Sequence, residues 1–127
     1  MQIYCGTDII EVSRIEDAVR NTKGFKENVY TKNEIENIDK IRSNMKYQRY
    51  AGRFAAKEAI FKAVSELLDD KFEISWKDAE VLDDVNGKPR IAFTNKKLEE
   101  KIESIDISIS HCKEYAVANV VIIAFER

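Results

Sequence analysis

A helical segment near the middle of the chain sets the strongest constraint on the fold. Residues 53–63 have the sequence RFAAKEAIFKA, which is rich in alanine, lacks glycine and proline, and spaces its aromatic side chains as a helix does. The small alanine side chains would let another element, or a neighbouring subunit, pack closely against it. We therefore predict a long helix over about residues 45–68, with most of its apolar surface buried.

Four charged side chains are embedded in this apolar segment. Glu58 and Lys62 are four residues apart, and Arg53 and Lys57 repeat that spacing, so each pair lies on one side of the helix. A carboxylate beside three cations can hold a metal ion and a polyphosphate together. The same pattern is also typical of a solvated helix face with one Glu–Lys pair. The segment alone leaves both interpretations open.

A strand is predicted at the N-terminus, over about residues 2–11, from its β-branched and aromatic residues. Alternation places Gly6 and Asp8 on the same face as the apolar side chains of Tyr4 and Ile10. Gly6 would let a neighbouring group approach closely. A charge among apolar residues needs a partner, so Asp8 would bind a metal ion, pair with an arginine, or stand where the strand ends.

The only histidine of the chain, His111, ends an alternating run over residues 105–111, and a second apolar run follows over 115–125. A lone histidine at a strand end is more often structural or exposed than catalytic. The part of the second run over residues 120–125 is apolar on both faces. It is therefore either a central strand of one sheet or a strand covered by another subunit.

The remaining segments complete an α+β pattern. Ser13 with Glu16, and Thr31 with Glu34, have the spacing of capping boxes that open short helices. Residues 21–26 are predicted as a loop, and residues 76–83 and 89–93 as a hairpin whose turn contains Asn86 and Gly87. A polar helix over 95–103 precedes the last two strands.

Composition narrows the class of protein. The 127 residues predict one compact domain, 1–127, and the formal net charge of −2 gives no overall attraction for nucleic acid. No apolar run reaches the ~20 residues of a membrane span, and we expect no export signal. We expect Cys5 and Cys112 to be buried, reduced thiols of a cytoplasmic protein, with a contact between their two strands left open.

Several motifs, in order along nearly the whole chain, resemble those of holo-acyl-carrier-protein synthases, the AcpS-type 4′-phosphopantetheinyl transferases. The two signature motifs correspond to GTDII at 6–10 with Arg14, and to RFAAKEA at 53–59 with Lys62. Weaker matches are YTKNEI at 30–35, Trp76 with EV at 80–81 and GKP at 87–89, and SISH at 108–111 with AVA at 116–118.

The resemblance implies a single-domain fold with an antiparallel sheet packed against a long central helix, assembled as a trimer with sites between subunits. It implies transfer of 4′-phosphopantetheine from coenzyme A to a serine of apo-acyl carrier protein in fatty acid biosynthesis. The reaction would depend on Mg²⁺ and release adenosine 3′,5′-bisphosphate.

The resemblance also implies roles for individual residues. Asp8 and Glu58 match the two metal-binding acids, and Lys62 matches a catalytic lysine at the pyrophosphate of coenzyme A. The base that accepts the serine proton stays open between a metal-bound water, Asp8 and Glu58.

Further residues match the family's substrate contacts. Arg53 and His111 match contacts to coenzyme A phosphates, supplied in the family by the adjacent subunit, and Arg14 matches a contact to the acidic carrier protein. Two weaker candidates have open alternatives: Gly87, Lys88 and Pro89 contact coenzyme A or form a plain turn, and Lys57 contacts it or is a solvated cation.

We extend the carrier surface to Arg20, Lys23 and Lys26, although a solvated amphipathic helix would show the same charges. The chain departs from the family pattern at Cys112, where many relatives have a small hydroxyl residue, and at Tyr30, where phenylalanine is commoner. Two other functions remain as alternatives: a metal-dependent phosphodiesterase or nuclease, and a non-catalytic module that binds coenzyme A.

Overall fold

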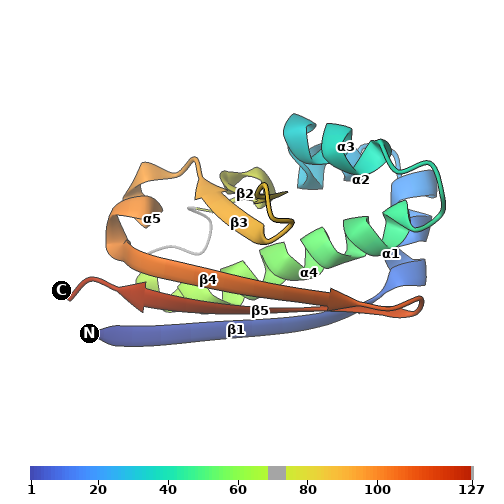
Figure 1. Cartoon of the computed structure of the whole chain (residues 1–127). Coiled ribbons are helices and arrows are strands. Elements are labelled where there is room, and N and C mark those ends of the chain that lie inside the picture. Colours follow the sequence, from blue (N-terminus) through green and yellow to red (C-terminus); the bar gives the residue numbers. More distant parts are fainter. Residues whose placement is uncertain (69–73, 127) are drawn as a thin grey trace.

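A three-stranded antiparallel sheet forms one layer of the molecule in a computed structural model, which describes residues 1–68 and 74–126 (Figure 1). Its strands are β1 (Gln2–Glu11), β4 (Ile102–His111) and β5 (Tyr115–Ala124), in the order β1-β5-β4. The apolar β5 is therefore the central strand, one of the two alternatives open from the sequence. Ala118 of β5 pairs with Asp8 of β1 on one side and with Ile109 of β4 on the other.

The long helix α4 (Lys46–Val64) packs across one face of this sheet, as predicted (Figure 1). Its last predicted turn is instead a 3₁₀ turn, η1 (Ser65–Leu67). The alanines at positions 55, 56, 59 and 63 are completely or almost completely buried. A Cβ on Gly6 would lie 2.0 Å from the Ala59 carbonyl oxygen, so strand and helix meet backbone to backbone here. The expected close approach at Gly6 is confirmed.

Three short helices cover one end of α4: α1 (Val12–Asn21), α2 (Phe25–Val29) and α3 (Lys32–Asp39) (Figure 1). The capping box of Thr31 and Glu34 opens α3, as predicted. The predicted box at Ser13 is wrong, because α1 already begins at Val12 with Glu11 as its N-cap. The predicted loop over 21–26 is also too long, since α2 starts after Gly24, which turns the chain with φ of 83°.

A second sheet contains two antiparallel strands, β2 (Ala79–Asp83) and β3 (Pro89–Phe93). Their turn includes Gly87 with φ of 80°. The first residues of the predicted hairpin are instead a 3₁₀ turn, η3 (Trp76–Asp78), which Ser75 and Asp78 close with a capping box. Helix α5 (Lys96–Lys101) then leads into β4.

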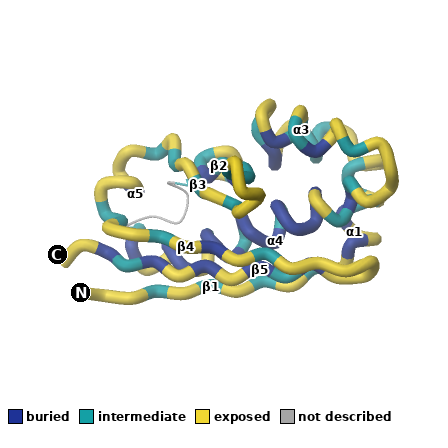
Figure 2. Tube along the Cα trace, viewed as in Figure 1, coloured by how far each residue is buried: buried dark blue, intermediate teal, exposed yellow. Residues whose placement is uncertain are grey.

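The face of the three-stranded sheet that points away from α4 is open in the single chain (Figure 2). Ile3, Ile9 and Val121 on this face are 65%, 63% and 47% exposed. Cys5 shares this face and is exposed, and Cys112 is exposed just beyond the end of β4. The prediction that both thiols are buried is wrong for the single chain, because no described element covers this side of β1. None of the described helices is long and apolar enough to cross a bilayer.

Candidate active site

Asp8 and Lys62 meet where the apolar face of β1 lies against α4. The Lys62 ammonium contacts Asp8 Oδ1 at 3.1 Å and the Thr7 carbonyl oxygen at 3.0 Å. The Asp8 side chain is 17% exposed, whereas the Lys62 side chain is 55% exposed. The lysine therefore bridges the strand and solvent.

Glu58 lies one helical turn before Lys62 and is partly buried. Burial raises the pKa of its carboxyl group, the negative charge of Asp8 raises it further, and Lys62 partly offsets both effects. The described residues contain no group of three or more His, Cys, Asp or Glu side chains placed to hold a metal. Two neighbouring carboxylates nevertheless suit Mg²⁺, which binds proteins through one or two carboxylates and takes its remaining ligands from phosphates and water. The donor set at Asp8 and Glu58 fits such an ion.

A second candidate site is a cavity of about 200 Å³ on the β4 side of α4. Its lining combines cationic and turn residues: Arg49, Gly52, Arg53, Asp83, Gly87, Pro89, Ile109 and His111. Both arginines share one carboxylate, since Arg53 lies 3.3 Å from Asp83 Oδ1 and Arg49 lies 3.5 Å from Asp83 Oδ2. The cavity thus has two guanidinium groups and one acid.

The Arg53 guanidinium has spare hydrogen-bonding capacity in this cavity. The residue is only 5% exposed, and its Nε is buried without a hydrogen-bond partner among the described residues. A buried donor without an acceptor costs about 1–3 kcal/mol. An anion with several oxygens would satisfy it, because guanidinium groups bind phosphates through paired N–H donors.

His111 faces the same cavity from the end of β4. Its Nδ1 lies 2.8 Å from Oε1 of Gln48. Partial burial lowers the pKa of the imidazole below its usual value, and the positive charges of Arg49 and Arg53 lower it further. Both effects favour the neutral ring in the ligand-free protein.

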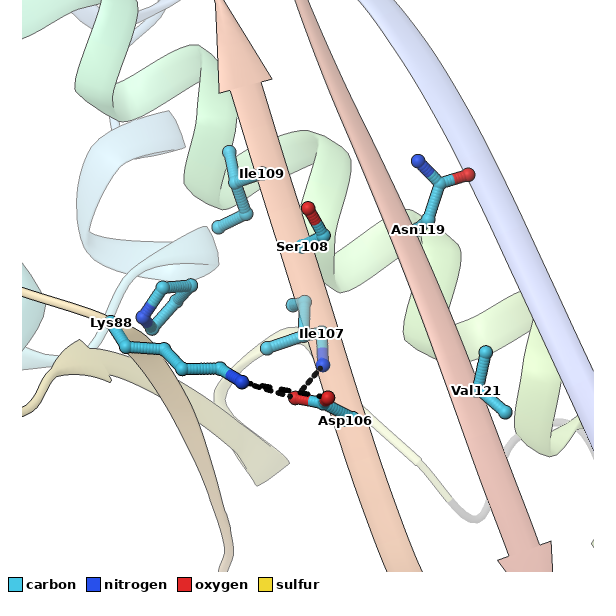
Figure 3. Close-up of a pocket in the computed structure, with 8 residues that line it drawn as sticks. Lys88, Asp106, Ile107, Ser108, Ile109, Asn119 and Val121 are labelled. Atoms are coloured by element: carbon cyan, nitrogen blue, oxygen red, sulfur yellow. Dashed lines mark hydrogen bonds and ion pairs between the residues drawn. The ribbon is translucent and has the colours of Figure 1, made fainter.

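An adjoining cavity of about 320 Å³ shares Pro89 and Ile109 with the first and extends along β4 (Figure 3). Lys88 reaches across it from the β2–β3 turn and pairs with Asp106 at 3.1 Å (Figure 3). The structure thus brings four predicted coenzyme A residues into one cavity, namely Arg53, Gly87, Pro89 and His111, and places Lys88 beside them.

The two clusters lie on different flanks of α4. Asp8 belongs to β1 and His111 to β4, the two outer strands of the sheet, with β5 between them. Arg53 and Glu58 are five residues apart, which turns their side chains about 140° from each other around the helix. A single chain therefore does not unite the predicted metal site with the predicted phosphate site.

Lys57 does not belong to either cluster. It is completely buried and contacts Glu34, also completely buried, at 3.0 Å. Its ammonium also donates to the carbonyl oxygens of Trp76 at 2.9 Å and Ala79 at 2.7 Å. Both alternatives from the sequence, a coenzyme A contact and a solvated cation, are wrong, because Glu34 from α3 takes the charge inside the fold.

Of the predicted carrier-binding residues, Arg14 and Arg20 lie on α1, Lys23 follows that helix, and Lys26 lies on α2. Arg14 is exposed and has no side-chain partner among the described residues. Arg20 is also exposed but pairs with Glu16 at 3.0 Å and lies over the Tyr47 ring at 4.7 Å. Lys26 pairs with Asp39 at 2.7 Å. Arg14 is therefore more available than Arg20 and Lys26.

Sequence reasoning missed Arg49 and Asp83 in the lining of the cavity around His111, and Gln48, which contacts the His111 ring. One signal was available, since Arg49 precedes Arg53 by four residues and lies on the same side of the helix. No local pattern marked Asp83, which comes from β2, or Gln48, whose partner is distant in the sequence.

A family model and several known proteins match nearly the whole chain. The family model of the 4′-phosphopantetheinyl transferase superfamily matches residues 4–120. The holo-[acyl-carrier-protein] synthase of Fusobacterium nucleatum is 44% identical, with 97% of this chain and 100% of the relative covered. The holo-[acyl-carrier-protein] synthase of Ruminiclostridium cellulolyticum is 42% identical, with 96% of this chain and 92% of the relative covered.

Solved structures show the same relationship. A holo-(acyl-carrier-protein) synthase from Bacillus anthracis, in complex with CoA (3′,5′-ADP), has a TM-score of 0.78 and 38% identity, with 94% of each chain covered. The Helicobacter pylori enzyme in complex with coenzyme A has a TM-score of 0.79 and 32% identity, with 94% of this chain and 99% of that chain covered.

Proposed function

Because this chain belongs to the holo-acyl-carrier-protein synthase family of 4′-phosphopantetheinyl transferases, we propose that it moves 4′-phosphopantetheine from coenzyme A to a serine of apo-acyl carrier protein. The serine oxygen forms a bond to the β-phosphorus, the bond from that phosphorus to adenosine 3′,5′-bisphosphate breaks, and the serine proton passes to a base, for which Asp8 and Glu58 are the chain's own candidates. The observation that carries this proposal is the cluster of Asp8, Glu58 and Lys62 between β1 and α4. The whole chain, 1–127, forms the transferase domain.

Asp8 and Glu58 would hold Mg²⁺, on which the reaction would depend. When bound, this ion would stabilise negative charge on the pyrophosphate. The two acids repel each other in its absence, as the raised pKa of Glu58 indicates after the larger effect of burial. A cation between them removes that repulsion.

Lys62 would stabilise the leaving group. Its side chain is about half exposed, and its ammonium donates to Asp8 and to the Thr7 carbonyl oxygen. It therefore retains one of its three donors for a phosphate oxygen as adenosine 3′,5′-bisphosphate departs. Phosphoryl transfer depends mainly on such positioning and charge stabilisation.

The cavity of Arg49, Arg53 and His111 would bind the 3′-phosphate of coenzyme A, with Gly87, Lys88 and Pro89 beside the nucleotide. This cavity and the Asp8 cluster lie at different edges of the sheet. As the family resemblance implies, we infer that the chain works as a homotrimer, in which the cavity of one subunit faces the acids of its neighbour; the separation of the two clusters within one chain supports a site shared between subunits. The exposed apolar side chains of Ile3, Ile9 and Val121 support an assembly that covers this sheet face.

Arg14 and Arg20 on α1 would meet the acidic carrier protein. Arg14 is the stronger candidate because it has no partner of its own among the described residues. We expect Arg14→Glu to weaken carrier affinity by about tenfold and to reduce its salt dependence, since like charges now meet. Coenzyme A binding should stay unchanged. Equal weakening of both ligands would instead indicate a misfolded variant.

The decisive experiment incubates the protein with apo-acyl carrier protein, coenzyme A and Mg²⁺ and weighs the carrier by mass spectrometry. A gain of one phosphopantetheine group, lost on chelation, supports the proposal. No gain, with hydrolysis of DNA or phosphodiesters instead, would favour a nuclease or phosphodiesterase. Binding of coenzyme A without transfer would favour a non-catalytic module.

The proposed setting is fatty acid biosynthesis in the cytoplasm. Two exposed, unpaired thiols, Cys5 and Cys112, are compatible with a reducing compartment. Carriers of fatty-acid and other pathways, compared in the same assay, would establish which one is modified fastest.

A further inference from the structure

The contact between Gln48 and His111 determines which ring nitrogen carries the proton. The two side chains meet through Gln48 Oε1 and His111 Nδ1, at 2.8 Å. An amide oxygen can only accept a hydrogen bond, so Nδ1 is the donor. In a neutral imidazole the other nitrogen, Nε2, then has a lone pair and no proton.

The surroundings of this ring are strongly cationic. The charged groups that line the cavity with it are Arg49 and Arg53 from α4 and Asp83 from β2. Asp83 is already shared by the two arginines. The cavity therefore attracts anions, while a bare Nε2 lone pair would repel a phosphate oxygen.

A proton on Nε2 resolves this conflict. The imidazolium would donate Nδ1–H to Gln48 and Nε2–H to the phosphate, and the second bond would be charge-assisted. We propose that Gln48 is a positioning residue that fixes the Nδ1–H form of His111, so that the phosphate of coenzyme A enters this cavity together with one proton. The inference rests on the proposed function, because it assumes that this cavity binds coenzyme A.

Protonation of His111 would make coenzyme A binding depend on pH. In the free protein, burial and then the two arginines lower the pKa of His111. A bound phosphate is negative and raises it again. At a pH between the His111 pKa of the free protein and that of the complex, binding takes up a proton. Coenzyme A affinity therefore falls as the pH rises toward the pKa of the complex.

The first test needs no ligand. His111 is the only histidine, so its ring signals in an NMR titration need no assignment. We expect the Nδ1–H form in the wild type and a shift toward Nε2–H in Gln48→Ala. In Gln48→Glu the carboxylate should raise the histidine pKa by about one unit or more.

The matched control is Gln2→Glu, at the far end of β1, which should leave the ring unchanged. A wild-type ring protonated on Nε2 would show that the Gln48 amide faces the other way and donates, which overturns the proposal. Unchanged ring signals in both Gln48 variants would overturn it too. If Gln48→Ala does not fold, the pKa of Gln48→Glu decides.

The second test measures coenzyme A binding by calorimetry at pH 7 in buffers with different ionisation enthalpies. We expect net proton uptake in the wild type, reaching up to one proton per site, and none in His111→Gln. Binding without proton uptake overturns the coupling while the transferase proposal stands. Absence of binding refutes the coenzyme A site itself, and the ligand-free spectra still decide whether Gln48 fixes the ring.

Discussion

Two lysines of α4, Lys57 and Lys62, have opposite environments although they are five residues apart. Lys57 is completely buried, and its ammonium contacts Glu34 at 3.0 Å and two backbone carbonyl oxygens at 2.9 and 2.7 Å. The Lys62 side chain is 55% exposed and reaches Asp8 at 3.1 Å. One lysine is enclosed by the fold, and the other is open to a ligand.

The surroundings of the two lysines differ in which charged and hydrogen-bonding groups are left without a partner inside the protein. An ammonium has three donors, and those of Lys57 all have acceptors inside the protein. Glu34 also accepts hydrogen bonds from the backbone N–H groups of Thr31 and Val81. Around Lys62, by contrast, the pKa of the Glu58 carboxyl group is raised by burial and then by the negative charge of Asp8. The first arrangement joins α3, α4 and β2, whereas the second, under the proposed function, would be completed by a cation and a phosphate.

The largest effect on stability is expected from Lys57→Ala. It leaves the Glu34 carboxylate buried without its partner, so we expect the free energy of unfolding to fall by about 3–5 kcal/mol. Urea denaturation measures this loss. In a double-mutant cycle with Glu34→Ala, the double variant should lose less than the sum of the two single losses.

A Lys57→Ala variant with wild-type stability and lost activity would contradict the conclusion that Lys57 stabilises the fold. Lys57 would then act on the substrate, as Lys62 is proposed to do.

Lys62→Ala should show the reverse pattern. We expect turnover to fall by about 10²–10³-fold, because the cation proposed to stabilise transition-state charge is lost. The free energy of unfolding should change by less than about 1 kcal/mol, since exposed pairs contribute little. Steady-state kinetics and calorimetry with coenzyme A separate the two roles. Equal losses of turnover and coenzyme A affinity would assign Lys62 to ground-state binding.

Gly6→Ala tests the spacing that brings Asp8 to Lys62. The new Cβ would lie 2.0 Å from the Ala59 carbonyl oxygen, which is backbone and cannot rotate away. We expect a loss of about 1–3 kcal/mol in stability as the helix shifts, with a fall in turnover. Thermal unfolding and the transfer assay measure the two effects.

Gly52→Ala is the matched control for stability, because its Cβ would meet only the Ile109 side chain, at 3.0 Å. Equal stability losses at the two positions would show that the close backbone contact at Gly6 has no special importance.

Much of the site formed by β1 and α4 was predictable from the sequence, because it depends on the local periodicity of each element. A period of two places Gly6 and Asp8 together on β1, and a period of 3.6 places Glu58 and Lys62 together on α4. The capping box at Thr31 is local as well, and it formed as predicted. The motif resemblance then indicated that the strand and the helix meet.

Features that depend on distant partners were not predictable. The burial of Lys57 requires Glu34 from another helix, and the pairing of Arg49 requires Asp83 from another sheet. The exposure of Cys5 depends on what covers the open sheet face, which alternation within β1 does not reveal. Sequence periodicity identifies a face of an element, whereas its partner is set by the tertiary structure.

A third lysine–carboxylate pair lies between the two extremes and predicts the smallest effect. Lys26 and Asp39 are 25% and 33% exposed and 2.7 Å apart, and the Tyr50 hydroxyl donates to Asp39 at 2.6 Å. Burial opposes ionisation of Asp39, but the hydrogen bonds from Lys26 and Tyr50 outweigh it and lower its pKa. This carboxylate therefore stabilises the fold when it is ionised.

We expect Asp39→Asn to lower the free energy of unfolding at pH 7 by about 1 kcal/mol or less. Because the folded pKa lies below the unfolded one, the contribution is complete above about pH 5 and disappears as the pH falls through the folded value. Urea denaturation at several pH values should show the two proteins converging in acid. A difference that persists at low pH would mean that the Tyr50 contact, rather than the charge, stabilises this end of α4. A loss as large as that of Lys57→Ala would show that burial does not separate these lysine pairs.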